Sequence, residues 1–116
     1  MDTNNKLVNL SIDLAVEILN LVKYLKQQHE TIICNQIGRA GTSIGANIHE
    51  AQYAHSIADF TCKLQIALKE ANETSYWLLL LAKTNQIGQT EYEHLEKLCR
   101  EIRITLIHSI KTSKRQ

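Results

Sequence analysis

The sequence predicts an all-α fold, an antiparallel up-and-down four-helix bundle. The chain has no proline and only four glycines, so little in it interrupts a helix. Apolar residues recur every three or four positions over long stretches, and short connections between these stretches make successive helices antiparallel neighbours. At 116 residues the chain forms a single domain, 1–116. We expect its helices at about residues 5–29, 32–55, 57–85 and 91–112.

Capping residues mark where each expected helix begins. Asparagine, serine and threonine side chains accept hydrogen bonds from the free N–H groups of a first helical turn, and an acidic residue three positions on completes a capping box. The expected caps are Asn4 or Asn5, then Thr31, then Ser56 with Asp59, then Thr90 with Glu93. The third helix is expected to end near Asn85, with Gly88 in the turn that follows.

Apolar residues occupy more than one face of these helices, which favours self-association. Beside its core stripe, which runs from Leu7 to Leu25, the first helix has a second stripe comprising Val8, Ile12, Val16, Leu19 and Val22. Opposite the core stripes of the third and fourth helices lie Cys62, Ile66, Trp77, Leu80, Ile104 and Ile107. A monomer that exposed all of them would carry an unusual apolar patch. We therefore predict a homo-oligomer with these residues in its interface; the alternative is that the stripes only widen contacts within one chain.

Three glycines in the second expected helix, Gly38, Gly41 and Gly45, have two interpretations. Each glycine costs a helix interior about 1 kcal/mol relative to alanine, so it is useful where another backbone approaches closely. Alternatively, the helix begins after Gly41, and the first two glycines belong to a loop.

The composition of the chain narrows the classes of protein to which it can belong. The formal net charge is only +1, so overall charge does not indicate nucleic-acid binding. Cys34, Cys62 and Cys99 are far apart and odd in number, which is typical of reduced, buried thiols in a cytoplasmic protein. The N-terminus lacks the apolar stretch of a signal peptide, and no run of about eighteen apolar residues could span a membrane. We expect a cytoplasmic protein with no membrane partner.

Enzyme motifs are incomplete. His49-Glu50 is followed by Tyr53 where a zinc protease has its second histidine, so zinc would lack its pair of imidazoles. Glu91 and His94 form one Glu-x-x-His, whereas a di-iron bundle needs two. We therefore expect no catalytic residues, no metal and no cofactor, which disfavours a metal or redox bundle.

The middle of the chain resembles one bacterial family. The segment Arg39-Ala-Gly-Thr-Ser43-Ile44-Gly-Ala-Asn47-Ile48-His-Glu50, then Asp59-Phe60, Ile66 to Ala71, Glu73 and Tyr76-Trp77-Leu78, resembles the four helix bundle proteins related to 23S rRNA intervening-sequence proteins. Many relatives have proline at the position of Gly45 and glycine at that of Ala51. The resemblance implies an up-and-down bundle that assembles into a barrel-like homopentamer, with no known catalytic residues. Relatives that serve diversity-generating retroelements imply a basic surface that binds nucleic acid and a reverse transcriptase.

A polar line on the second helix comprises Arg39, Ser43, Asn47 and Glu50, which recur at helical spacing. A buried amide such as that of Asn47 must find partners or cost about 1–3 kcal/mol. We predict that this line forms a network with Glu73 or Asn72 and fixes the register between helices or subunits. The alternative is a ligand or nucleic-acid site.

The fourth helix carries the candidate nucleic-acid site, which comprises Lys97, Arg100, Arg103, Lys111 and Lys114. Repeated around an oligomer, these cations would form a basic band that attracts phosphate; the alternative is an ordinary solvated face. The sequence thus predicts a non-enzymatic scaffold that binds structured RNA or DNA. The competing hypothesis is a protein adaptor, for example an accessory subunit of a nucleic-acid enzyme such as a reverse transcriptase.

Overall fold

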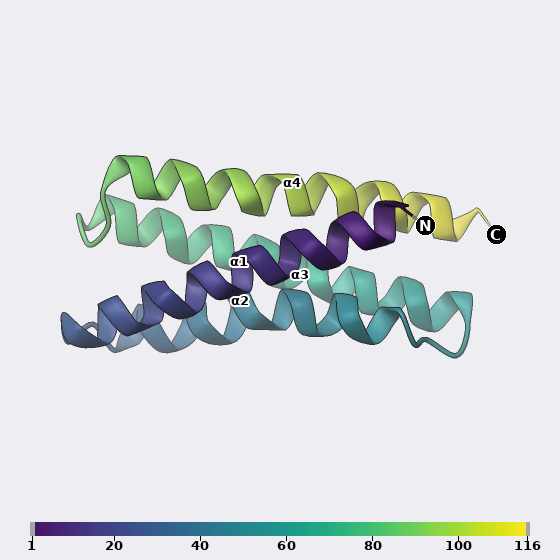
Figure 1. Ribbon diagram of the computed structural model, residues 1–116, viewed down its shortest axis with the longest axis horizontal. Helices are drawn as coiled ribbons and strands as arrows, with labels where there is room; N and C mark the ends of the chain where they lie inside the picture. Colours follow the sequence, from purple (N-terminus) through teal and green to yellow (C-terminus); the bar gives the residue numbers. More distant parts are fainter. Residues whose placement is uncertain (1, 116) are drawn as a thin grey trace.

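The computed structural model describes residues 2–115, which form four helices (Figure 1). These are α1 (Asp2–Gln27), α2 (Ile32–Ala51), α3 (Ile57–Lys83) and α4 (Gln89–Lys114), and the described residues include no strand. The prediction of an all-α protein with four helices is confirmed. The largest shift of a helix end is in α2, which ends at Ala51 and not near His55.

The helices lie side by side along a molecule that measures 47 × 22 × 18 Å. The chain reverses direction at each connection, with α1 in front and α3 behind it, between α2 and α4 (Figure 1). Helices α1 and α3 each contact both α2 and α4. Within residues 2–115, the backbones of α1 and α3 do not approach closely, so these two helices occupy opposite corners of the bundle.

The apolar stripes predicted from helical spacing fill the space between the helices. Leu14, Ile44 and Leu78, from three different helices, are fully buried. Burying a side chain of this size contributes about 1.5–3 kcal/mol relative to leaving it exposed. Two buried hydroxyls are paired where α3 meets α4, since those of Thr61 and Ser113 lie 2.7 Å apart.

The capping prediction is correct for α3. Ser56 Oγ accepts a hydrogen bond from the Asp59 backbone N–H at 3.0 Å. The Asp59 carboxylate accepts in return from the backbone N–H of His55, at 3.2 Å, and not from that of Ser56. This pair fixes the start of the helix that carries much of the outer apolar surface.

The other predicted caps are wrong. Helix α2 is capped by Glu30, whose carboxylate accepts from the N–H groups of Ile33 and Cys34 at 2.7 and 2.9 Å, while Thr31 makes no side-chain cap. A carboxylate has the advantage of its charge at the positive end of the helix dipole. Helix α4 follows Gly88, so Thr90 lies inside its first turn. Helix α1 likewise begins at Asp2, before Asn4 and Asn5.

Two helices end on residues with left-handed backbone conformations. His29 has a φ of 62° and Asn85 a φ of 59°, just after the ends of α1 and α3. In both turns the following N–H returns to a carbonyl of the last helical turn, Glu30 to Leu25 and Gln86 to Leu81, each at 2.9 Å. These bonds satisfy carbonyls that the helix end leaves free.

The glycines of α2 mark a close approach to α1. Because α2 begins at Ile32, all three glycines are helical, and the interpretation that places Gly38 and Gly41 in a loop is wrong. A Cβ at Gly41 would lie 2.9 Å from two side-chain carbons of Ile18, and a Cβ at Gly45 would lie 3.3 Å from Ser11 Oγ. The absence of side chains lets α1 pack tightly on α2.

We expect Gly41→Ala to lower the melting temperature, although alanine favours a helix by about 1 kcal/mol. The new methyl group overlaps Ile18 at carbons close to its backbone, and Ile18 is fully buried. Overpacking of this kind costs about 1–3 kcal/mol. Thermal unfolding followed by circular dichroism measures the change. Gly88→Ala is the control, since a Cβ there meets nothing within 4 Å, and an equal effect of both substitutions would refute the argument.

Candidate functional site

The outer face of α4 carries four of the five predicted nucleic-acid contacts. Lys97, Arg100, Lys111 and Lys114 are exposed, and none of them forms an ion pair within residues 2–115. Successive separations of three and four residues place Ile104 and Ile107 on the same face, 62% and 41% exposed. We call Lys97, Arg100, Ile104, Ile107, Lys111 and Lys114 the α4 basic face. The predicted nucleic-acid site and part of the predicted oligomer interface therefore share one surface.

The fifth cation, Arg103, lies away from this face and connects α4 to α3. Its guanidinium donates to Glu96 Oε2 at 3.0 Å and to the hydroxyl of Ser75. The Arg103 side chain is only 21% exposed, and that of Glu96 is 16% exposed. Because its charge is already matched by a carboxylate, Arg103 has little capacity left for phosphate.

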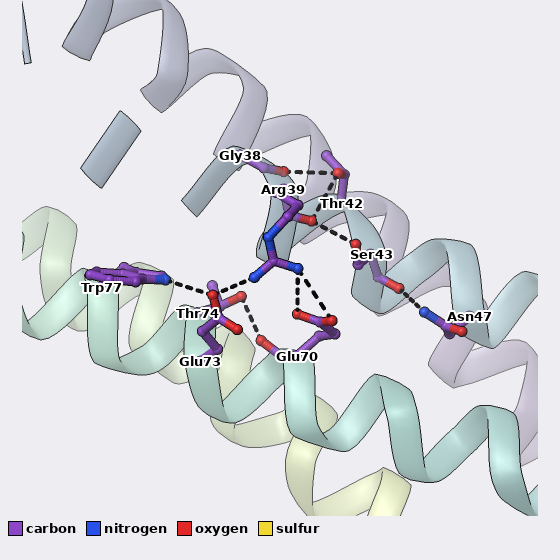
Figure 2. Close-up of polar contacts among 9 residues, drawn as sticks. All are labelled: Gly38, Arg39, Thr42, Ser43, Asn47, Glu70, Glu73, Thr74 and Trp77. Atoms are coloured by element: carbon purple, nitrogen blue, oxygen red, sulfur yellow. Dashed lines mark hydrogen bonds and ion pairs between the residues drawn. The ribbon is translucent and has the colours of Figure 1, made fainter. Parts of the chain in front are cut away.

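A polar cluster bridges α2 and α3 around Arg39, as Figure 2 shows. The guanidinium donates to Glu70 at 3.2 Å and also to Glu73. Glu73 accepts a second bond, at 3.0 Å, from the indole N–H of Trp77. The structure thus brings Arg39 and Glu73 together, as predicted. Glu70 was missed in the sequence, although its position one helical turn before Glu73 was the available signal.

The rest of the predicted network stays outside this cluster (Figure 2). Ser43 donates to the carbonyl of Arg39 at 2.7 Å and Asn47 to the carbonyl of Ser43 at 2.9 Å, both within α2. Glu50 instead pairs with Lys63 of α3 at 3.1 Å. Asn72 is exposed on α3. Within this chain Asn47 donates only to its own helix and does not join α2 to α3. Its predicted role in fixing the register between subunits stays a prediction.

Hydrogen bonds hold the cluster in its charged form. The indole of Trp77, followed by the guanidinium of Arg39, lowers the pKa of Glu73 from its ordinary value of 4.5. Glu73 in turn raises the pKa of Arg39. Because Arg39 is half exposed, the pairs add only about 0–1 kcal/mol each, and their main effect is to fix how α2 lies on α3.

The second stripe of α1 lies on the outside of the bundle. Ile12, Val16 and Leu19 are 53%, 53% and 49% exposed, and Val8 is half-buried beside them. We call these four residues the α1 stripe. Their spacing of four, four and three residues places them on one face, opposite the buried Leu14, Ile18 and Leu21.

The outer side of α3 is also apolar. Ile66 is 37% exposed, Cys62 is exposed, and Trp77 and Leu80 are half-buried. We call Cys62, Ile66, Trp77 and Leu80 the α3 face. The prediction of three buried thiols is wrong for Cys62, whereas Cys34 and Cys99 are buried. Burial, followed by the nearby charge of Glu96, raises the pKa of Cys99 to about 12.

Other titratable groups are paired or dispersed. His94 lies 2.8 Å from Glu17 of α1, and this contact joins α4 to α1. Within the described part of the chain, no three histidine, cysteine, aspartate or glutamate side chains gather as metal ligands would. None of the helices in residues 2–115 is long and apolar enough to cross a membrane.

Comparison with known proteins identifies the family. The family model described as 23S rRNA-intervening sequence protein matches residues 3–108. The chain belongs to this family. A crystal structure from Bacteroides thetaiotaomicron, described as a protein with unknown function from the S23 ribosomal protein family, is 50% identical. The similarity covers 94% of this chain and 98% of that one, with a TM-score of 0.91. No curated protein matches the chain.

The family match confirms the resemblance inferred from the sequence and separates two parts of the α4 basic face. Lys97, Arg100, Ile104 and Ile107 lie within the residues that match the 23S rRNA-intervening sequence protein family, whereas Lys111 and Lys114 lie beyond residue 108. The α1 stripe, the α3 face and the Arg39 cluster are all inside the matched range. The homopentamer and the nucleic-acid binding implied by the resemblance stay predictions.

We expect the fluorescence of Trp77, the only tryptophan, to report the protonation of Glu73. A group whose pKa is lowered on folding stabilises the fold above its ordinary pKa, and this contribution is lost as pH falls through the lowered value. Emission should therefore change in a step with a midpoint below 4.5, accompanied by a loss of stability.

The matched variants for this titration are Glu73→Gln and Glu91→Gln. The first removes the carboxylate that accepts from Trp77, so the step in emission should disappear. The second removes an exposed carboxylate of α4, so the step should remain. An unchanged step in Glu73→Gln would show that another group causes it.

Proposed function

We propose that this chain is a non-enzymatic, self-associating scaffold that presents the α4 basic face to the phosphates of structured RNA or DNA. The observation that carries this proposal is the row of exposed cations on α4, Lys97, Arg100, Lys111 and Lys114, without ion-pair partners within residues 2–115. Cations with no carboxylate partner are free to replace the counterions that surround a nucleic-acid backbone. Action in the cytoplasm suits its free cysteines, which would remain reduced there.

The chemistry of this face favours backbone contacts over base reading. The face has no aromatic side chain on which an unpaired base could stack. Four cations on an α-helix also lie too far apart to converge on one small anion, but they can follow a line of phosphates. We therefore expect binding that depends strongly on salt and weakly on sequence.

A non-enzymatic role agrees with how the other charged groups are used. The carboxylates of Glu17, Glu70 and Glu73 accept from side chains of a neighbouring helix and support packing between helices. The carboxylate of Glu96 accepts from Arg103 of its own helix. The name of the family, which refers to an intervening sequence of 23S rRNA, adds RNA to the ligands worth testing first.

Self-association is the second part of the proposal. The α1 stripe exposes three aliphatic side chains by about half, and covering the exposed half of each would contribute about half of the roughly 1.5–3 kcal/mol that full burial gives. We propose that α4 stays outside this contact, since apposing two basic faces would bring like charges together. Ile104 and Ile107 then remain between the cations and are available to a ligand.

Charge reversal on the α4 basic face should weaken binding to a structured RNA. For Lys97→Glu combined with Lys111→Glu, the slope of log affinity against log salt should decrease by about one unit for each phosphate that the variant no longer neutralises. Fluorescence anisotropy with a labelled RNA hairpin, over a salt series, gives both the affinity and the slope.

The control is Lys6→Glu combined with Lys83→Glu, which makes the same change in net charge at exposed positions of α1 and α3. This variant should retain most of the affinity and the original slope. Equal losses in both variants would indicate only a general charge effect and would contradict a specific α4 interface. A wild-type affinity that does not change with salt would contradict electrostatic binding altogether.

A protein adaptor is the second candidate function, and the exposure of Ile104 and Ile107 favours it. An acidic, apolar surface of a partner protein, such as a nucleic-acid enzyme, would match two isoleucines flanked by cations. Ile104→Ser combined with Ile107→Ser keeps every charge. This variant should leave RNA affinity nearly unchanged under the first proposal, whereas a protein partner would lose its apolar anchor.

The mass of the chain in solution tests self-association directly. One copy has a mass of 13.2 kDa. We expect light scattering coupled to size-exclusion chromatography to give a multiple of this mass at micromolar concentration. A mass of one copy would overturn the proposed self-association. The proposed RNA binding would then be tested separately by the dependence of affinity on salt.

A further inference from the structure

We propose that Tyr76 of α3 is a stacking platform for an unpaired base, so that the preferred ligand of the α4 basic face is a nucleic acid with an unpaired base beside a duplex. This inference rests on the proposed nucleic-acid binding and specifies the class of ligand. The α4 basic face can neutralise phosphates but has no aromatic side chain of its own. The aromatic ring must then come from a neighbouring helix, and Tyr76 supplies it.

The register of α3 against α4 places Tyr76 beside the cations of the α4 basic face. The hydroxyls of Thr61 and Ser113 lie 2.7 Å apart, and the chain reverses direction between these two helices (Figure 1). Counting the same number of residues from this contact along both helices puts Tyr76 at a level between Lys97 and Arg100. Packed helices lie about 8–10 Å apart, so a strand that follows these cations passes close to the Tyr76 ring.

The side chain of Tyr76 lies on the outer side of α3. The residue before it, Ser75, accepts a hydrogen bond from a guanidinium of α4, whereas the residue after it, Trp77, is joined through Glu73 to α2. The helical repeat directs Tyr76 between these two sides and away from the fully buried Leu78. The Tyr76 side chain is accordingly 53% exposed.

The Tyr76 ring is held in place by Trp77. Their ring centroids lie 5.1 Å apart with the planes at 63°, an edge-to-face arrangement. The indole N–H of Trp77 donates to Glu73 at 3.0 Å, and Glu73 also accepts from Arg39, so Trp77 is itself fixed. In an edge-to-face pair only one ring offers its face to the other, so at least one face of Tyr76 stays open. A ring that is positioned in advance loses little conformational entropy when a base stacks on it.

The groups around Tyr76 suit a nucleotide. Asn72 and Leu79, about one turn before and after it, are exposed, so an amide and an aliphatic side chain flank the ring. The amide of Asn72 can donate to and accept from the edge of a base. The nearest carboxylate on the same helix, Glu73, lies beside the positive charge of Lys69 as well as the guanidinium that it binds. The ring is therefore not next to an unmatched negative charge that would repel a phosphate.

Stacking on this ring adds a preference for structure and not for sequence. Every base has an aromatic face, so a phenol ring accepts any of the four. A bulge or a single-stranded end presents such a base next to the phosphates of a duplex. A blunt duplex keeps its bases stacked on one another and can use only the cations of α4.

Two RNA duplexes with the same number of phosphates and the same end label test the inference. Both contain 2-aminopurine, a fluorescent analogue of adenine whose emission falls when it stacks. The analogue is paired in a blunt duplex and unpaired, as a bulge, in the other. In fluorescence anisotropy the wild type should bind the bulged duplex at least about fivefold more tightly, the gain expected from one stacked base. The emission of the bulged analogue should fall on binding.

The matched variants are Tyr76→Ala, Tyr76→Phe and Tyr53→Ala, and circular dichroism verifies that each is folded. Tyr76→Ala should remove both the advantage of the bulged duplex and the fall in emission, but bind the blunt duplex as the wild type does, since every cation remains. Tyr76→Phe should retain both effects, because stacking needs the ring and not the hydroxyl. Tyr53→Ala is the control: Tyr53 is 74% exposed, but it lies just beyond the end of α2, far along the bundle from Tyr76.

The outcomes separate this inference from the proposed function. Equal affinity of the wild type for both duplexes, with the expected dependence on salt, would overturn stacking on Tyr76 alone. A second copy of the chain that covers Tyr76 would give the same result. If Tyr76→Ala weakens binding of both duplexes equally, the residue only supports the structure of the site, which also overturns the inference. A wild type that binds neither duplex would overturn the inference together with the proposed function.

Discussion

The close packing of α1 on α2 is the constraint on which the surfaces of this molecule depend. Gly41 leaves room for Ile18, and this contact fixes the rotation of α1 about its own axis. With Ile18 directed inward, the helical repeat directs Ile12, Val16 and Leu19 outward. An additional methyl group on α2 would displace α1 and with it the stripe. The packing of α1 on α2 inside the bundle therefore determines which residues of α1 are exposed on its surface.

Helical periodicity was sufficient to predict the class of the fold, because burial of one stripe per helix dominates the free energy of folding. It was less informative about helix ends. Several neighbouring side chains compete to satisfy the same free N–H groups, and at α2 the carboxylate of Glu30 prevails over the hydroxyl of Thr31. The choice depends on the path of the preceding turn, where His29 has a left-handed conformation that the sequence alone did not indicate.

The polar residues illustrate a second limit of sequence reasoning. Spacing placed Arg39, Asn47 and Glu50 along one edge of α2, but it could not assign their partners. Long side chains select among several carboxylates and cations within reach, so Arg39 pairs with Glu70 and Glu73 while Glu50 pairs with Lys63. The short amide of Asn47 reaches only its own helix. Similarly, helical spacing places Ile104 and Ile107 among the cations of α4. The predicted nucleic-acid site and the predicted oligomer interface therefore require the same exposed face of α4, which becomes evident only when all residues of that face are considered together.

The proposed self-association would connect to nucleic-acid binding through the α4 basic face. If the copies associate without covering α4, each copy adds its own α4 basic face to the assembly. Four cations on one copy release few counterions when they meet a nucleic acid, so a single copy binds weakly at physiological salt. Repetition multiplies the number of phosphate contacts in one complex, and each further copy that engages the same strand acts at a high effective concentration. In such an assembly a chain with a net charge of only +1 would bind phosphates effectively, because the assembly would add up the local charge of one helix from each copy and not the net charge of the protein.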